Sequence, residues 1–252
     1  MIELTGKTAL VTGASRGIGR AAALSFARAG CNVVLGYRRD ETAVRNVVED
    51  IRVAGRHAIA VAGDVRERNT FERLFSEGKE VFGKIDIVVG NAGIWKKTPV
   101  DEMSDADWQE TIDVNLTSIF LTCQFAAREM KPRRSGKIVL ISSTAGQRGE
   151  ALYSAYAASK GGIQALTKSL AVELGPWNIQ VNCVAAGWVD TDMSRSVLTD
   201  PIFQQRVEEE IPLKRIATPE QIAGAILFLA SDLASHVQGE ILNVNGGSVL
   251  CG

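Results

Sequence analysis

Hydrophobic and polar positions along this chain alternate between two patterns: short runs of β-branched residues and longer stretches with helical spacing. The runs TALVT, NVVLGY, HAIAVA and IDIVVG each end near a glycine, and helical patterns at 17–29, 41–54 and 67–82 separate them. Strands that alternate with helices predict a parallel sheet with helices on both faces.

The second half of the chain continues this alternation. A helical stretch at about 104–131 leads to the strand KIVLIS, a second long helix and the strand IQVNCVA, and a helix near 220–229 precedes a last strand, GEILNVNGG. The segment around 190–215 is polar and contains prolines, which predicts a mobile helical flap over the substrate. We therefore expect an α/β protein with a doubly wound parallel sheet of about seven strands, in a single domain over 1–252.

Composition excludes several classes of protein. The 252 residues carry 28 Lys and Arg against 29 Asp and Glu, so a net charge of -1 favours neither nucleic acid nor a membrane surface as a partner. The four cysteines are far apart and the histidines number two, which predicts reduced thiols and no metal site. We expect a cytoplasmic protein, because the first residues lack a signal-peptide pattern and no apolar run approaches the about 20 residues of a membrane span.

The glycine-rich stretch TGASRGIG directly follows the first predicted strand and opens the first predicted helix. Gly13, Gly17 and Gly19 leave room for backbone N–H groups to approach a phosphate at the positive end of that helix. A glycine cluster is often only a tight turn, but its position between a strand and a helix favours nucleotide binding.

The stretch YSAYAASK places two tyrosines and a lysine on one predicted helix. Tyr156 and Lys160 are one turn apart on the same face, whereas Tyr153 lies two turns from the lysine. A nearby ammonium favours a phenolate, so Lys160 is expected to lower the pKa of Tyr156 from its ordinary value of about 10. The pair alone is a weak sign of catalysis, because many helices carry such a pair by chance.

With its other motifs included, the chain resembles the short-chain dehydrogenase/reductase family over essentially its whole length. The motifs have that family's order and spacing: TGASRGIG, Asp64 in AGDV, GNAG at 90–93, Asn115 in DVNL, Ser143 in ISSTAG, and Tyr156 with Lys160. The resemblance implies a Rossmann fold, an NADP(H)-dependent enzyme and a homotetramer that pairs the helices at 104–131 and 153–173.

The resemblance also implies roles for the catalytic residues. Tyr156 is the general acid that protonates a carbonyl oxygen as the carbon accepts hydride, and it acts as base in the reverse direction. Ser143, thirteen residues earlier, hydrogen-bonds the substrate oxygen. Lys160 also hydrogen-bonds the nicotinamide ribose, and Asn115 helps to hold a water that passes protons to it.

Structural interpretations of the same residues stay open. Ser142 and Ser143 can be strand-end hydroxyls that satisfy a turn, and Asn115 can be a buried amide that only bridges strands. Asp64 can cap the following helix as well as contact adenine. GNAG can serve the structure and the cofactor together.

Cofactor choice depends on the end of the second predicted strand, which lies beside the adenosine ribose in this architecture. NAD-dependent relatives have a carboxylate there, whereas this chain has Tyr37 followed by Arg38, and Arg16 can approach from the glycine stretch. Two guanidinium groups suit a 2′-phosphate, which predicts NADP(H), although Arg38 and Arg39 can also be exposed residues at a helix start. The expected cofactor-binding residues are Gly13, Ser15, Arg16, Gly17, Ile18, Gly19, Tyr37, Arg38, Arg39, Asp64, Val65, Asn91, Ala92, Gly93, Tyr156, Lys160, Gly187, Val189 and Thr191.

One position departs from the family pattern. The family usually has Pro-Gly after its sixth strand, and this chain has Ala186 before Gly187, so the turn loses one fixed φ. Val189 and Thr191 still stand where the family binds the nicotinamide carboxamide. Trp188 either lines the substrate pocket or packs against the flap.

The leading functional hypothesis is an NADPH-dependent carbonyl reductase, most similar to the 3-oxoacyl-acyl-carrier-protein reductases of fatty acid biosynthesis. An NAD(P)-dependent dehydrogenase of a sugar, a polyol or another small alcohol is the alternative, and a non-catalytic nucleotide-binding protein is a rival of another class. Val172 and Trp177 stand where those reductases have arginines that attract an acidic carrier. Arg133 and Arg134 are either a substitute basic patch or part of a solvated loop.

Overall fold

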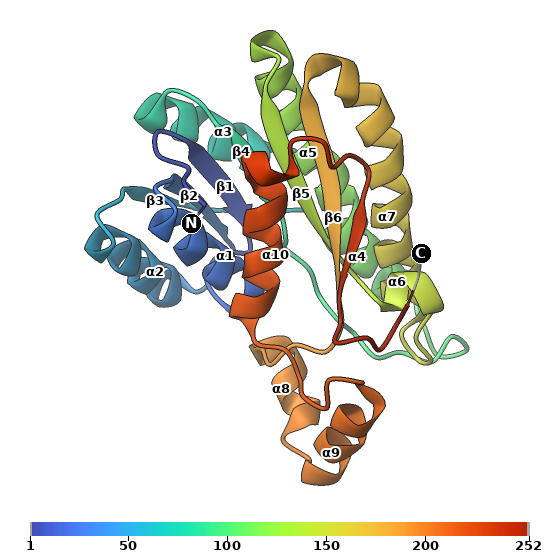
Figure 1. Cartoon of the computed structure of the whole chain (residues 1–252). Helices are drawn as coiled ribbons and strands as arrows, with labels where there is room; N and C mark the ends of the chain where they lie inside the picture. Colours follow the sequence, from blue (N-terminus) through green and yellow to red (C-terminus); the bar gives the residue numbers. More distant parts are fainter. Residues whose placement is uncertain (1, 251–252) are drawn as a thin grey trace.

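A computed structural model describes residues 2–250, and its centre is one parallel sheet of seven strands (Figure 1). The strands lie in the order β3-β2-β1-β4-β5-β6-β7, and each neighbouring pair is parallel. Their bounds are β1 Thr8–Thr12, β2 Asn32–Tyr37, β3 Ala58–Ala62, β4 Ile87–Gly90, β5 Gly136–Ser143, β6 Ile179–Ala186 and β7 Ile241–Val244. The predicted doubly wound sheet is confirmed.

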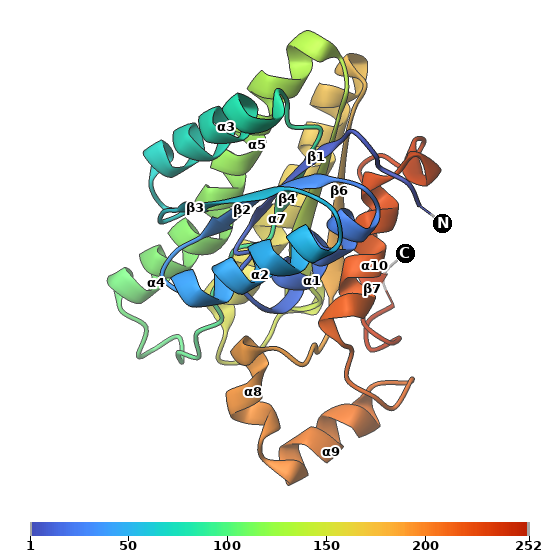
Figure 2. The ribbon, with the colours of Figure 1, turned by 90° about the vertical axis from the view of Figure 1, so that its left-hand side faces the viewer.

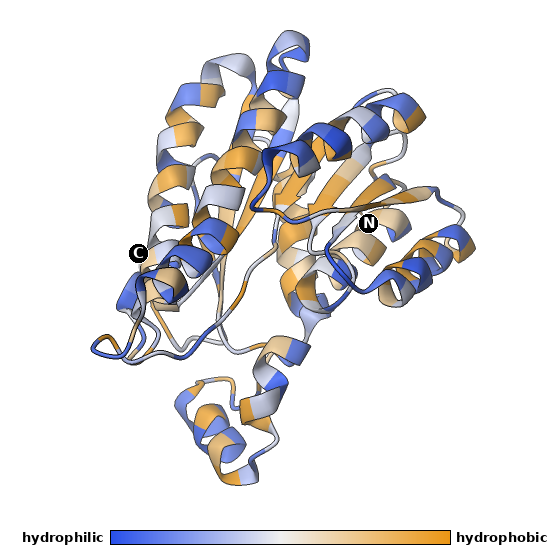
Figure 3. Ribbon diagram, turned by 180° about the vertical axis from the view of Figure 1, so that it is seen from behind, coloured by the Kyte–Doolittle hydropathy of each residue, from blue (hydrophilic) through white to orange (hydrophobic). Residues whose placement is uncertain are grey.

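Helices cover both faces of this sheet, which makes two hydrophobic cores (Figures 1 and 2). One face is covered by α1 (Gly17–Arg28), α2 (Glu41–Val53) and α10 (Pro219–Ala230). The other face is covered by α3 (Arg68–Phe82), α5 (Ser118–Met130) and α7 (Ser154–Leu174). Figure 3 shows hydrophobic and hydrophilic residues alternating along these helices, as expected for helices with one buried side. Strands β1 and β4 are buried at every position, which explains their continuous apolar runs.

The helical stretch predicted at 104–131 has three parts. Helix α4 (Asp105–Ile112) runs into a π-helical turn at Asp113–Thr117 before α5 begins. A π-helical turn is wider than an α-helical one and often occurs at functional sites. This turn carries Asn115, whose side chain is completely buried.

Two short helices form the segment predicted as a flap. Helices α8 (Asp192–Leu198) and α9 (Pro201–Glu210) project from the body of the molecule, while α6 (Ala145–Arg148) lies close to α7 (Figure 1). The mobility of α8 and α9 stays a prediction.

Three predicted thiols are free and buried: Cys31, Cys123 and Cys183. Cys251 lies outside the described residues. Within residues 2–250, the helices are too short or too polar for any of them to cross a membrane.

The order of the strands creates the crevice that matters for function. The chain moves outward from β1 through β2 to β3 and then returns to the other side of β1 with β4. The loops after β1 and β4 therefore leave in different directions at the carboxyl edge of the sheet, where ligands of such folds bind.

Candidate active site

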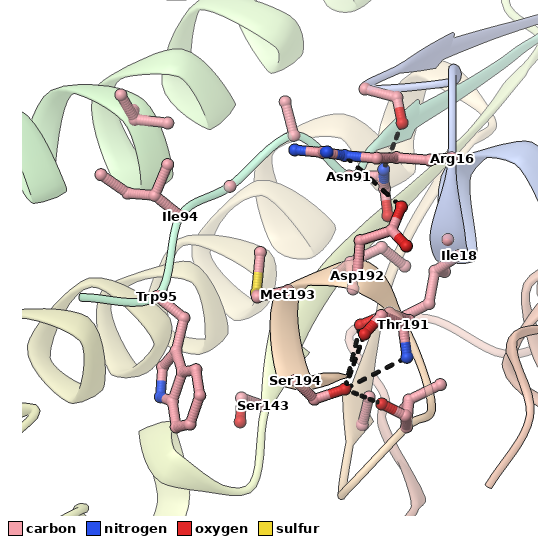
Figure 4. A pocket seen from close by; sticks show the side chains of 18 of the residues that line it. Arg16, Ile18, Asn91, Ile94, Trp95, Ser143, Thr191, Asp192, Met193 and Ser194 are labelled. Atoms are coloured by element: carbon pink, nitrogen blue, oxygen red, sulfur yellow. Dashed lines mark hydrogen bonds and ion pairs between the residues drawn. The ribbon is translucent and has the colours of Figure 1, made fainter. Parts of the chain in front are cut away.

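A cavity of about 600 Å³ opens at this carboxyl edge (Figure 4). It is lined by the loops after β1, β2, β4, β5 and β6 and by the first turns of α1 and α8. Every residue predicted for catalysis or cofactor binding lines this cavity except Gly19, Asp64 and Asn115. The structure thus brings together side chains that are up to 178 positions apart, from Gly13 to Thr191.

The glycine stretch forms the floor of one end of the cavity. Gly13 and Gly17 have φ values of 66° and 54°, which residues with a side chain rarely adopt. Gly19 lies behind the cavity, and a Cβ there would collide with the carbonyl oxygen of Gly13. Gly19 is therefore needed for close packing of α1 on β1, while the first two glycines leave the backbone open to a ligand.

Thr12 and Asn91 fix the distance between the loops after β1 and β4. The Thr12 hydroxyl accepts hydrogen bonds from the backbone N–H groups of Asn91 and Ala92 at 2.9 and 3.1 Å. The Asn91 amide donates to the Thr12 carbonyl at 2.9 Å. Asn91 thus serves the structure of the crevice, and Thr12, the first residue of TGASRGIG, is a positioning residue that was not among the predicted site residues.

Three of the predicted catalytic side chains meet at the centre of the cavity. The Lys160 Nζ atom lies 5.7 Å from the centre of the Tyr156 ring and donates a 2.9 Å hydrogen bond to the Ile141 carbonyl. Ser143, the last residue of β5, hydrogen-bonds the Tyr156 side chain. A hydroxyl therefore lies next to the phenol and an ammonium lies beside the phenol ring, a set of groups suited to proton transfer to a carbonyl oxygen.

Burial dominates the pKa values of this group. Burial raises the pKa of Tyr156 to about 12, against a lowering by the hydrogen bond from Ser143, and the charge of Glu150 adds to the rise. Burial likewise lowers the pKa of Lys160 to about 8. The expectation that Lys160 lowers the pKa of the phenol is therefore wrong in this structure, because the loss of water around both groups outweighs their interaction.

Ser142 and Ser143 differ in what they bind. The Ser142 hydroxyl donates to the Lys160 carbonyl at 2.8 Å and accepts from the Gln164 amide at 3.0 Å, so it ties β5 to α7. The Ser143 hydroxyl accepts a 3.1 Å bond from the Ala145 backbone N–H and hydrogen-bonds Tyr156. Ser142 therefore has the structural role that one interpretation gave to both serines. The position of Ser143 fits the catalytic interpretation.

Asn115 lies behind the cavity and holds its wall. Its side chain accepts from the Ile94 N–H at 2.8 Å and donates to the Ile94 carbonyl at 2.9 Å. It also donates to the Ser159 hydroxyl at 3.1 Å, which connects the π-helical turn with α7. The amide therefore bridges elements, as one of the two interpretations holds, and it fixes the loop after β4.

Three charged residues meet at the outer end of the cavity, beyond β2. Arg38 and Arg66 bind the Asp64 carboxylate at 3.0 and 2.7 Å. The hydrogen bonds from Arg66 and the nearby arginine charges lower the pKa of Asp64 to about 2. Asp64 accepts from the backbone of Arg66, whereas α3 begins only at Arg68, so it does not cap that helix. It holds Arg38 at the cavity.

The loop after β6 is fixed by the sheet in place of the usual proline. Ala186 pairs with Ser143 on one side and Val244 on the other, and the Gly187 N–H donates to the Val244 carbonyl at 3.1 Å. Trp188 both lines the cavity and contacts Phe203 of α9, with ring centres 5.7 Å apart. Both interpretations of Trp188 therefore hold.

Comparisons with known proteins agree with this arrangement. A family sequence model described as enoyl-(acyl carrier protein) reductase matches residues 13–248. A 3-oxoacyl-acyl-carrier-protein reductase of Synechocystis is 41% identical to this chain, over 99% of this chain and 100% of the relative. The chain belongs to the short-chain dehydrogenase/reductase family. As a short-chain dehydrogenase/reductase, it is an oxidoreductase that binds a nicotinamide cofactor.

Other members of the family act on different substrates. An L-rhamnose 1-dehydrogenase (NAD(P)(+)) of Azotobacter vinelandii is 39% identical, over 97% of each chain. A solved structure of a candidate 2-deoxy-D-gluconate 3-dehydrogenase from Agrobacterium tumefaciens, with bound NADP, has a TM-score of 0.90 and 37% identity, over 98% of each chain. Family membership thus establishes the type of chemistry and leaves the substrate open.

Several residues that line the cavity of this dehydrogenase/reductase lie outside the family motifs. They include Trp95, Arg148, Glu150 and Met193. Trp95 stands two residues after GNAG, and Glu150 lies between Ser143 and Tyr156, so proximity to motifs was the one available signal. Such residues differ with the substrate, which is why a motif shared by the family cannot identify them.

Proposed function

We propose that this chain is an NADP(H)-dependent enzyme that interconverts a ketone and a secondary alcohol, with a 3-oxoacyl thioester as its first candidate substrate. The observation that carries the proposal is the convergence of Ser143, Tyr156 and Lys160 in a cavity whose other end holds the glycine stretch. A protein that only binds nucleotide has no need of a buried phenol and ammonium at that place.

The residues at the outer end fit a cofactor with a 2′-phosphate. Arg16, Arg38 and Arg39 line the cavity; Arg38 is held in position by Asp64, and Arg16 lies 4.0 Å from the Asp192 carboxylate of α8. Asp40 also lines the cavity, but its carboxylate caps α2 by accepting from the Ala43 N–H at 2.9 Å. Guanidinium groups match a phosphate dianion in charge and geometry, and the bound nicotinamide then supplies or accepts the hydride.

The proton follows a short route through side chains of this chain. Ser143 donates to the substrate oxygen and orients it, and Tyr156 transfers its proton to the same oxygen as the carbon becomes tetrahedral. The Lys160 ammonium stabilises the phenolate that this transfer leaves. In alcohol oxidation the same groups act in reverse order.

Arg38→Ala tests the choice of cofactor. Loss of one charge-assisted contact, about 1.5–3 kcal/mol, should weaken NADPH binding at least about 10-fold and leave NADH binding nearly unchanged. Fluorescence titration of both cofactors measures this, with Arg45→Ala as the control, because Arg45 is an exposed arginine of α2 paired with Glu41. NADH use by the wild type with equal or higher kcat/KM, or equal weakening of both cofactors, would contradict the proposal.

The surface offers little to an acidic carrier protein, which favours a free small molecule as a second candidate substrate. Arg133 bonds Asp86 at 3.2 Å and the Ile85 carbonyl at 2.6 Å, so it belongs to the structure. Arg134 packs over the Trp177 ring at 5.5 Å, and Val172 is 80% exposed where an arginine is expected. A free sugar or polyol needs no such patch.

A comparison of carriers distinguishes these candidates. We expect acetoacetyl groups on an acyl carrier protein to be reduced no more than about threefold better, in kcat/KM, than the same group on a small thiol, because the basic patch that would attract the carrier lacks its arginines. Initial rates with NADPH at low salt measure the difference. A preference for the carrier above about 10-fold that disappears at high salt would identify a docking surface and favour carrier-bound substrates. The expected homotetramer and cytoplasmic location stay predictions.

A further inference from the structure

Four aromatic residues from separate segments pack into one cluster, and two of them form a wall of the cavity. The rings of Trp95 and Tyr153 stack in parallel, with centres 4.4 Å apart and planes at 4°. Trp188 meets Trp95 at 5.7 Å and 89°, and its other contact is Phe203 of α9. Trp95 and Trp188 line the cavity, and Figure 4 shows Trp95 with Ser143 among the lining side chains. Trp95 and Trp188 are only half-buried, so this wall presents apolar surface to a ligand.

Hydrogen bonds to the backbone hold this wall in position. Asn115 binds both the N–H and the carbonyl of Ile94, the residue before Trp95. The Thr98 N–H donates to the Leu152 carbonyl at 2.8 Å, which joins this loop to the turn before α7. Leu152 has a φ of 69°, a left-handed conformation that is rare for a leucine and that marks functional sites more often than others. Two loops thus form one preorganised surface.

Glu150 places a carboxylate within this apolar wall. It lines the cavity at the start of the same turn, whose closing bond runs from the Tyr153 N–H to the Glu150 carbonyl at 3.1 Å. Burial raises the pKa of Glu150, against lowering by a hydrogen bond from Trp95 and by the charge of Arg148. An ionised carboxylate can accept about four hydrogen bonds, and the indole supplies one of these. Glu150 lines the cavity, so the remaining capacity is available to a ligand there.

The charge of Glu150 acts on the catalytic centre. It raises the pKa of Tyr153 and of Tyr156, whereas Arg148 has no such effect on either phenol. The difference follows from exposure, because Arg148 lies at the surface where water screens it and Glu150 is half-buried. Glu150 therefore adds a negative contribution to the potential beside the reacting oxygen, opposite in sign to that of the Lys160 ammonium, and a second carboxylate close to Glu150 is disfavoured.

We propose that Glu150 and Trp95 select the substrate: an uncharged molecule with several hydroxyls, such as a sugar or polyol, whose hydroxyl donates to Glu150 and whose C–H groups lie against Trp95 and Trp188. This inference rests on the proposed function and decides between its two candidate substrates. An unsubstituted acyl chain leaves the remaining acceptor sites of the carboxylate without a donor, and an aldonate is repelled by it.

D-sorbitol and D-gluconate are matched probes, because they have equal chain length and differ in a terminal hydroxymethyl or carboxylate group. With NADP+, the wild type should oxidise sorbitol, or L-rhamnose as a second neutral probe, with kcat/KM at least about 10-fold above gluconate. Glu150→Gln should raise kcat/KM for gluconate and reduce this ratio below about threefold. Glu150→Ala should lower kcat/KM for the neutral probe about 10-fold, mainly through KM, as expected for one lost hydrogen bond to a charged group.

Opposite changes for the two probes separate substrate selection from a structural role, because damage to the turn would lower both. Glu80→Gln, on the exposed side of α3, is the control, and melting temperature and NADPH affinity report on the fold. Equal changes for both probes, or a wild-type preference for gluconate, would overturn the inference. Reduction of the acetoacetyl thioester that depends on Tyr156, with no turnover of either neutral probe, would also overturn it but leave the proposed function intact. NADPH binding with no turnover that depends on Tyr156, for any substrate, would overturn both.

Discussion

Tyr156→Phe should lower kcat by at least about 10³-fold while NADPH binds as tightly as to the wild type. The substitution removes the one proton that the proposed mechanism transfers to the substrate oxygen, and it keeps the ring that α7 presents to the cavity. General acid–base catalysis contributes about 10²–10⁴-fold, and loss of the hydroxyl also removes a hydrogen bond to the transition state. Single-turnover rates with NADPH measure the chemical step directly.

Tyr153→Phe is the matched control for this experiment. Both tyrosines are on the same turn of chain near the start of α7, but the Tyr153 ring stacks on Trp95 and its hydroxyl takes no part in the proposed proton transfer. We expect its kcat to stay within a few-fold of the wild type. If Tyr156→Phe keeps more than a few per cent of the rate, or if Tyr153→Phe is the inactive variant, the assignment of the acid is wrong.

Lys160→Met should lower kcat at least about 100-fold and weaken NADPH binding about 10-fold. Methionine fills much of the same buried space but has no charge to stabilise the phenolate and no donor for the ribose. Lys168→Met, an exposed position on the same helix, is the control and should behave as the wild type. Retention of more than a tenth of the rate would show that the ammonium is not part of the mechanism.

The same variant predicts a change in stability with pH. Burial lowers the pKa of Lys160 from 10.5 to about 8, so below pH 8 the folded protein holds a buried ammonium at a cost. That cost is lost as pH rises above 8, while the unfolded chain is still protonated, so the contribution of Lys160 to the stability of the protein prepared without nucleotide should rise from pH 8 towards 10. Burial raises the pKa of the Cys31, Cys123 and Cys183 thiols from 9.0 to about 12, so above pH 9 these thiols lower stability in the wild type and in the variant alike. Above pH 10 the raised pKa of Tyr156 acts in the opposite direction, because the unfolded phenol ionises first. Urea unfolding at several pH values should therefore show the stability of the wild type rising relative to that of Lys160→Met between pH 8 and 10.

Local sequence was sufficient to predict the features that depend on a single helix, strand or turn. The continuous apolar runs of β1 and β4 predicted buried parallel strands, because both faces of such strands are covered. The helical spacing of Tyr156 and Lys160 placed the two side chains on one face of α7, and the glycine stretch identified the turn between β1 and α1; a phosphate at that turn stays a prediction. Such features depend on neighbours within about one turn of the chain.

The tertiary structure decided everything that depends on residues from distant segments. It placed Glu150, Trp95 and Trp188 in one wall, paired Arg38 with Asp64, and used Arg133 to bind Asp86 inside the fold. It also reversed the expected direction of the pKa of Tyr156, because burial is a property of the whole fold and outweighs the one neighbour that helical spacing reveals. Local motifs therefore identify the chemistry of the family, whereas the choice of substrate depends on contacts between loops that only folding brings together.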